Sequence, residues 1–119
     1  MSVDVEFSQT DDIWVCRINE SIELFLVEEL RAFLLEKIEN HGMRKVIFRM
    51  DNEPFIDSSG LGAFMSLKYR LGDRVEFRFC ELRNNVNAVF SYTNLLSQFG
   101  IDDTLEDSIK AISDDASTN

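Results

Sequence analysis

The strongest constraint on the fold is an apolar strand that leads into a helix near the middle of the chain. Val46-Ile47-Phe48 is typical of a central strand, and a second apolar segment, Pro54-Phe55-Ile56, is followed at once by Asp57-Ser58-Ser59-Gly60-Leu61-Gly62. Apolar residues then recur at helical spacing as far as Leu71, where Gly72-Asp73 supplies a stop. This succession predicts one unit of an α/β sheet.

The spacing of apolar residues on either side predicts the remaining elements. Alternating residues favour strands, and apolar residues three or four apart favour helices. The predicted elements are a β-hairpin over residues 3–18, a helix over about 23–41, a strand over about 75–82, a helix over 84–98, a short strand marked by Ile101 and Leu105, and part of a last helix over 108–112. The order predicts a mixed sheet with helices packed against it.

Length and charge limit the class of protein. The 119 residues suit one domain, while residues 113–119 are rich in Ser, Asp, Thr and Asn and are expected to form a disordered acidic and polar tail. There is no long apolar run and no basic-then-apolar N-terminus, so we expect a cytoplasmic protein without a membrane span. The net charge of -10 opposes a phosphate backbone and argues against direct nucleic-acid binding.

The residues that usually carry catalysis or bind metals do not form a recognisable set. Cys16 and Cys80 lie in apolar segments without Cys-x-x-Cys spacing, so buried reduced thiols are expected. His41, the one histidine, falls at the end of a different helix from Ser59, so the serine lacks an adjacent base. The acidic pairs lack metal-ligand spacing and there is no glycine-rich nucleotide loop. We therefore expect no enzyme activity, metal or cofactor.

The 57–62 motif places serines at a helix N-terminus. The first backbone N–H groups of a helix have no partners within the helix, and its dipole favours an anion. Either Asp57 or Ser58 can cap the helix, which leaves a serine at its exposed start, where a phosphate would be stabilised. On local grounds alone the same sequence is also an ordinary helix start.

Residues 44–67 resemble the signature of STAS domains, especially that of bacterial anti-sigma factor antagonists. The shared core is a buried strand followed by the Phe-Ile-Asp-Ser-Ser-Gly-Leu-Gly sequence of residues 55–62. The order of apolar segments from about residue 3 to residue 112 is also similar to that of the family. The resemblance implies an α/β, STAS-like single domain over residues 1–112, with a mixed four- to five-stranded sheet and helices packed mainly on one face.

The resemblance also implies a function and its residues. In the family a partner kinase phosphorylates the second serine of the motif, which is Ser59 here, and the preceding aspartate is Asp57. The unmodified domain binds that kinase, a histidine-kinase-like ATPase that is also an anti-sigma factor, and a metal-dependent serine phosphatase restores the binding form. We expect partner contacts at and beside the motif, through Asp57, Ser58, Gly60, Leu61, Gly62, Glu23, Phe25 and Glu53.

A phosphate on Ser59 is expected to disrupt an interface that already holds the carboxylates of Glu23, Asp51, Glu53 and Asp57. Two other functions stay open. The chain could be a STAS adaptor in a signalling or transporter complex without a phosphorylation cycle. It could also be a small domain that binds an anionic metabolite at the N-terminus of the motif helix.

Three positions depart from the family pattern. Before the first helix this chain has Glu20-Ser21-Ile22-Glu23, which keeps a carboxylate and lacks the family's glycine. Arg49 stands where the family often has Asp or Asn, and Glu53 stands at a usually apolar position. These changes leave Ser59 untouched and concern the contacts made with the partner kinase.

Phe25 is unusual within the first predicted helix. At 100° per residue it falls on the polar side, together with Glu29, Ala32 and Glu36. It is expected to be partly exposed and to act as an aromatic anchor for a partner; the alternative is that it folds back into the core at a frayed helix start.

Overall fold

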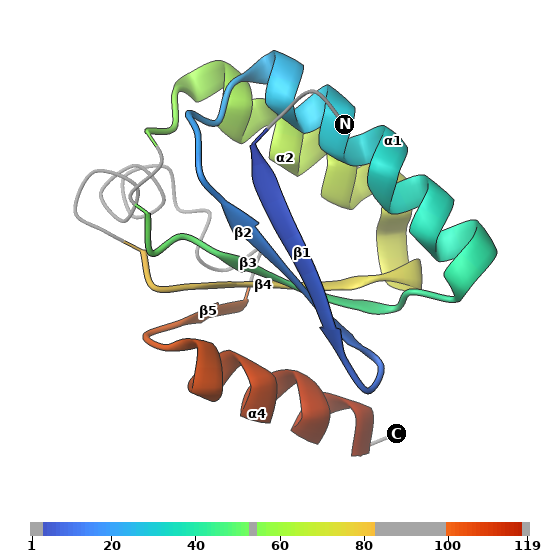
Figure 1. Cartoon of the computed structure of the whole chain (residues 1–119). Coiled ribbons are helices and arrows are strands. Elements are labelled where there is room, and N and C mark those ends of the chain that lie inside the picture. The colour runs from blue at the N-terminus through green and yellow to red at the C-terminus, as the bar shows by residue number, and fades with distance from the viewer. Residues whose placement is uncertain (1–3, 53–54, 83–99, 118–119) are drawn as a thin grey trace.

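The computed structural model describes residues 4–52, 55–82 and 100–117, and over these residues it forms one five-stranded sheet (Figure 1). The strands lie in chain order: β1 (Val5–Thr10), β2 (Ile13–Ile18), β3 (Lys45–Arg49), β4 (Glu76–Cys80) and β5 (Gly100–Asp102). β1 pairs with β2 antiparallel, and the other neighbours pair in parallel. The expected mixed sheet and the N-terminal hairpin are confirmed.

Helices cover both faces of this sheet. α1 (Leu24–His41) and α2 (Ser58–Leu71) lie on one face, and α4 (Leu105–Ser117) lies on the other (Figure 1). A short 3-10 turn, η1 (Gly72–Arg74), follows α2. Two of the three described helices therefore share one face, in agreement with the expected arrangement, and the helix expected over 84–98 lies outside the described residues.

The core between the sheet and helices α1 and α2 is built around phenylalanine rings. Parallel pairing places Phe48 of β3 next to Phe79 of β4, so both side chains point to the same face. The ring centroid of Phe48 lies 5.1 Å from the ring centroid of Phe79 and 5.3 Å from that of Phe64 on α2. All three side chains are fully buried. This cluster fixes the position of α2, which carries the serine motif.

A second, smaller core lies between the opposite face of the sheet and α4. It contains Ile13, Val15, Ile47, Cys80 and Ile112, with Leu105 and Ile109 packed against it. Cys16 and Cys80 are both buried and free, as expected, and burial raises the pKa of the Cys80 thiol to about 12.

The C-terminal segment differs from expectation in two respects. Leu105 begins α4 instead of belonging to the last strand, because Leu105, Ile109 and Ile112 are spaced to form one apolar stripe on a helix. The Thr104 hydroxyl oxygen caps this start by accepting the Asp107 N–H at 3.1 Å. The helix then continues to Ser117, so residues 113–117 are helical instead of forming a tail.

Replacement of Phe48 by Ala is expected to lower the free energy of unfolding by about 3–5 kcal/mol, because it leaves a cavity among the buried rings of the main core. Tyr69→Ala is the matched control, since Tyr69 is 89% exposed and its removal is expected to change stability by less than about 0.5 kcal/mol. Denaturant unfolding of both variants measures the difference. Equal loss in the two variants would contradict the assignment of Phe48 to the core.

Candidate functional site

The motif forms the first turn of α2, and Asp57 is its N-cap residue. Asp57 has an extended backbone conformation, and its Oδ1 atom accepts the Gly60 N–H at 2.7 Å. The Ser59 hydroxyl donates a hydrogen bond to the same Oδ1 atom at 2.8 Å. The Gly60 N–H, together with the Ser59 hydroxyl, holds the pKa of the Asp57 carboxyl below its ordinary value. Of the two capping residues expected from the sequence, Asp57 performs this role.

Ser59 is exposed to solvent on this first turn, whereas Leu61 is buried two residues later. Ser58 is the first residue of the helix. Gly60 is buried and Gly62 is exposed. The serine that the motif predicts as a phosphoacceptor is therefore accessible, and the backbone beside it is held in the interior.

Gly60 is buried because the segment before α1 crosses directly over it. A Cβ atom added to Gly60 would lie 2.2 Å from the carbonyl oxygen of Ile22, which is far inside van der Waals contact. At Gly62 an added Cβ would meet no atom within 4 Å. The close approach therefore requires glycine at the first position and not at the second.

Backbone pairing joins the same two segments. Ile22 forms an isolated parallel bridge with Ile56, and the Ile22 N–H donates to the Phe55 carbonyl at 2.6 Å. Both isoleucine side chains are buried. The start of α1 is thereby brought beside the start of α2, although 33 residues of sequence lie between Ile22 and Ile56.

The structure also accounts for the sequence before α1. Residues 20–23 contain no residue with a positive φ, so the missing family glycine imposes no backbone strain. Glu23 is the N-cap of α1, with an extended backbone and no capping hydrogen bond from its side chain. Its exposed carboxylate is thus available next to the motif.

Large apolar side chains are exposed around the two helix starts. Phe25 is 54% exposed, so the expectation of partial exposure is confirmed and the core alternative is wrong. Leu24 is 52% exposed, and Phe55, from the apolar segment that precedes the motif, is 60% exposed. The exposure of Phe55 could have been predicted from the sequence. Successive side chains of an extended segment point to opposite sides, so burial of Ile56 directs Phe55 outwards.

Arg49 and Asp51 belong to an ion-pair network at the ends of the parallel strands. Arg17 donates to the two Asp51 oxygens at 2.8 and 2.7 Å, and its hydrogen bonds hold the pKa of the Asp51 carboxyl below its ordinary value. Arg49 donates to Glu81 at 3.0 Å, and the other Glu81 oxygen accepts the Leu105 N–H at 2.9 Å. Asp51 is therefore a paired structural residue and not a free carboxylate of a binding surface. Glu53 lies outside the described residues.

Side chains that commonly bind metals do not cluster within residues 4–52, 55–82 and 100–117. That part of the chain contains no group of three or more His, Cys, Asp or Glu residues able to hold a metal ion. His41 closes the 18-residue helix whose first residue lies near the motif, so it is about 25 Å from that end of the helix. It cannot act as a base for Ser59.

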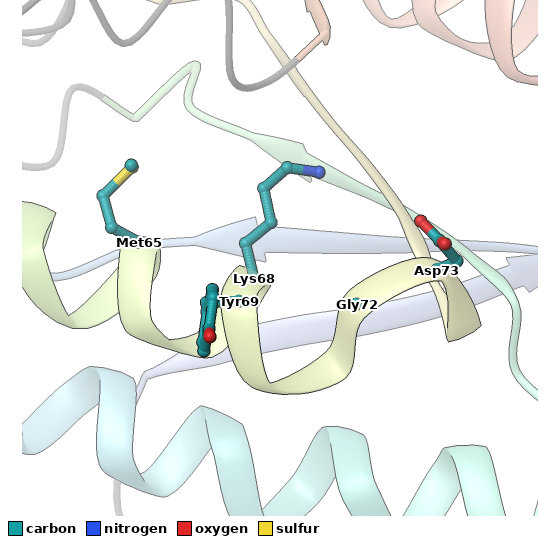
Figure 2. Close-up of a pocket in the computed structure, with 5 residues that line it drawn as sticks. All are labelled: Met65, Lys68, Tyr69, Gly72 and Asp73. Carbon is teal, nitrogen blue, oxygen red and sulfur yellow. The ribbon is translucent and has the colours of Figure 1, made fainter.

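A depression of about 420 Å³ lies along the C-terminal half of α2, away from the serine (Figure 2). Figure 2 shows the side chains of Met65 and Lys68 extending to the same side of the helix. The Lys68 ammonium lies 5.9 Å from the ring centre of Phe77, so its charge is already placed over an aromatic face. The lining residues are Met65, Lys68, Tyr69, Gly72 and Asp73.

Comparison with known proteins identifies the family of this chain and other proteins that share its fold. The model of the STAS domain family matches residues 4–108. A candidate anti-sigma factor antagonist of Thermotoga maritima has a similar structure, with a TM-score of 0.80, 19% identity, and coverage of 92% of this chain and 94% of that chain. The anti-sigma factor antagonist SpoIIAA in its unphosphorylated form aligns with a TM-score of 0.63, 20% identity, and coverage of 92% and 98%.

A similar structure also occurs in a protein of another class. A sulfate transporter family protein of Wolinella succinogenes aligns with a TM-score of 0.72, 14% identity, and coverage of 87% of each chain. At these identities the structural matches establish a shared fold. In the part of this chain that the structure describes, no helix combines the length and apolar character needed to span a membrane.

The contact at Gly60 leads to a paired prediction. Gly60→Ala is expected to destabilise the fold by about 1–3 kcal/mol, because the new methyl group would collide with the Ile22 backbone. Gly62→Ala is the matched control and is expected to be neutral or stabilising by up to about 1 kcal/mol, since alanine is the better helix former. Thermal and denaturant unfolding measure both. A Gly60→Ala variant as stable as Gly62→Ala would contradict the close contact.

The Asp57 cap predicts a specific pH dependence. A carboxyl whose pKa is lower in the folded state stabilises the fold above its unfolded pKa of about 3.9, and this contribution is lost as the pH falls through the folded pKa. Asp57→Asn keeps a good cap residue and removes the titration. The difference in unfolding free energy between wild type and variant is expected to shrink below about pH 4. A difference independent of pH would show that the ionised carboxylate has no role.

Proposed function

This chain belongs to the STAS domain family, and we propose that it is an anti-sigma factor antagonist. In this proposal the protein is a non-enzymatic binding module of bacterial signalling in the cytoplasm, and its unmodified form sequesters an anti-sigma factor that is also a serine kinase. The sigma factor is thereby released, so the effect on transcription is indirect. The fold shared with SpoIIAA and the Thermotoga protein supports this class.

The observation that carries the proposal is the position of Ser59. Its hydroxyl is exposed at the start of α2 and is bonded only to Asp57 among the hydrogen bonds of the described structure. A kinase of the histidine-kinase-like ATPase type would transfer the γ-phosphoryl group of ATP to Ser59 Oγ, with release of ADP and of the hydroxyl proton. A metal-dependent serine phosphatase would hydrolyse the new ester and restore the binding form.

The geometry provides a physical reason for a switch at this serine. Phosphorylation removes the hydrogen that Ser59 donates to Asp57 and places about 1.5 to 2 negative charges beside that carboxylate. The phosphate oxygens also compete with the Asp57 carboxylate for the Gly60 N–H group, which Asp57 accepts in the unmodified protein. A partner surface matched to the unmodified turn therefore meets both a new charge and a changed cap.

The other functions considered have weaker support. An adaptor role without phosphorylation is favoured by the similarity to the Wolinella sulfate transporter family protein, although at 14% identity this shows the fold alone. Binding of an anionic metabolite at the start of α2 is disfavoured because the Asp57 carboxylate already accepts the Gly60 N–H. A serine switch accounts for more of the observed contacts around Ser59 than either alternative function does.

The test uses Ser59→Ala and Ser59→Asp. Both variants are expected to fold, since the side chain is exposed. Ser59→Ala should retain binding to the kinase and resist phosphorylation, whereas Ser59→Asp should weaken binding by about 1–3 kcal/mol through charge repulsion. Calorimetry with a kinase recovered by Ser59→Ala bait measures affinity, and fragmentation mass spectrometry locates the phosphate.

Two results would contradict the proposal. Equal affinity of the two variants for the kinase would indicate an adaptor without a serine switch. Phosphate located on Ser58 would reassign the acceptor, and thermal stabilisation by acidic metabolites without any protein partner would favour the ligand-binding alternative.

A further inference from the structure

Three large apolar side chains project into solvent beside the motif. Leu24, Phe25 and Phe55 are each more than half exposed, although folding normally buries leucine and phenylalanine. Leu24 and Phe25 start α1, and Phe55 precedes the N-cap of α2. Exposed apolar groups that gather in one place commonly mark an interaction surface, whereas isolated ones do not.

Backbone pairing brings the two segments that carry these three residues side by side. The Phe55 carbonyl accepts the Ile22 N–H at 2.6 Å, and Leu24 follows Ile22 by only two residues. Ile22 and Ile56 are directed into the core, with 1% and 2% exposure, so Phe55 is directed outwards from the same paired segment. Leu26 and Val27 anchor the first turn of α1 and leave the preceding residues outside the core.

The charges around the apolar residues restrict what can cover them. Glu23 and Asp57 are exposed at the two helix starts, and Glu23 forms no ion pair with any residue in the described ranges. The chain as a whole carries a net charge of -10. An anionic membrane surface would be repelled, and a two-fold contact with a second copy would bring the same carboxylates together.

We infer that Leu24, Phe25 and Phe55 form a docking surface for a protein partner that presents an apolar pocket with a basic side chain opposite Glu23. We refer to the three residues as the apolar anchor. Burial of two aromatic rings supplies the affinity, and the ion pair at Glu23 sets the orientation. This inference rests on the proposed function, since Ser59 lies at the rim of the same surface.

The anchor also specifies how phosphorylation would act on binding. The rings require an apolar pocket from which water is excluded, and a phosphate on Ser59 would have to give up its hydration at the edge of that pocket. Its nearest described neighbour is the Asp57 carboxylate, which offers no compensation. The apolar anchor therefore favours binding of the partner, and phosphorylation of Ser59 disfavours it.

The experiment compares the double variant Phe25→Ala/Phe55→Ala with Tyr69→Ala, in which a still more exposed aromatic ring is removed from the C-terminal half of α2. Calorimetry measures the affinity of each unphosphorylated variant for the purified kinase-like ATPase recovered with Ser59→Ala bait. The double variant is expected to lose affinity by about tenfold or more with little change in melting temperature, and the Tyr69 variant to bind as wild type. Glu23→Lys is expected to weaken binding further.

Each other outcome has a defined meaning. If the kinase binds in a Ser59-dependent manner and the double variant binds as wild type, the anchor is wrong and the proposed function stands. If binding requires the anchor and Ser59→Asp has no effect, the anchor stands and the switch is wrong. Sedimentation showing a dimer that the double variant abolishes, or binding to phosphatidylglycerol vesicles, would overturn a protein partner in favour of a second copy or a membrane. Absence of any protein binder would overturn both proposals.

Discussion

The contact between the Gly60 α-carbon and the Ile22 carbonyl holds the candidate site together. It brings the start of α2 against the segment before α1 at a distance that only glycine permits. The Ile22–Ile56 bridge then joins the same two segments through their backbones. Without this contact the Ser59 hydroxyl, the Glu23 carboxylate and the Phe25 ring would belong to separate surfaces. With it, residues far apart in the sequence form one exposed site above a fully packed core.

The carboxylates in and around this site fall into two groups, one paired with arginines and one exposed at the helix starts. At the ends of the parallel strands, arginines bind Asp51 and Glu81, and Glu81 in turn accepts the first N–H group of α4. These carboxylates are compensated within the fold and contribute little net charge to a partner surface. At the helix starts, Glu23 and Asp57 have no such cations among the described residues, so in the proposed complex they determine the charge that a partner meets. Arg49, which departs from the family pattern, belongs to the first group.

The sequence predicts most of the fold because burial of strands and helices leaves a periodic pattern. The hairpin, α1, β3, α2 and β4 all follow from the spacing of apolar residues, and the polar side of a helical wheel identifies Phe25 as exposed. The remainder depends on relations between segments. The assignment of Leu105 to a helix depends on tertiary packing, because this residue packs against the cluster that contains Ile47 and Cys80 on the sheet. The pairing of Asp51 with Arg17 depends on the parallel register of β2 and β3, and the exposure of Phe55 depends on the Ile22–Ile56 bridge.

In the proposed switch, the serine itself needs no catalytic machinery. A single oxygen, Asp57 Oδ1, accepts both the Ser59 hydroxyl and the Gly60 N–H, so the state of the serine is linked to the cap of the helix that contains it. A neutral hydroxyl stabilises that carboxylate, whereas a phosphate repels it and competes for the same N–H group. The main core remains unaffected, because Phe64 and Leu61 hold α2 against the sheet from the opposite side. A modification at one exposed atom can therefore change the surface that a partner contacts while the domain remains folded.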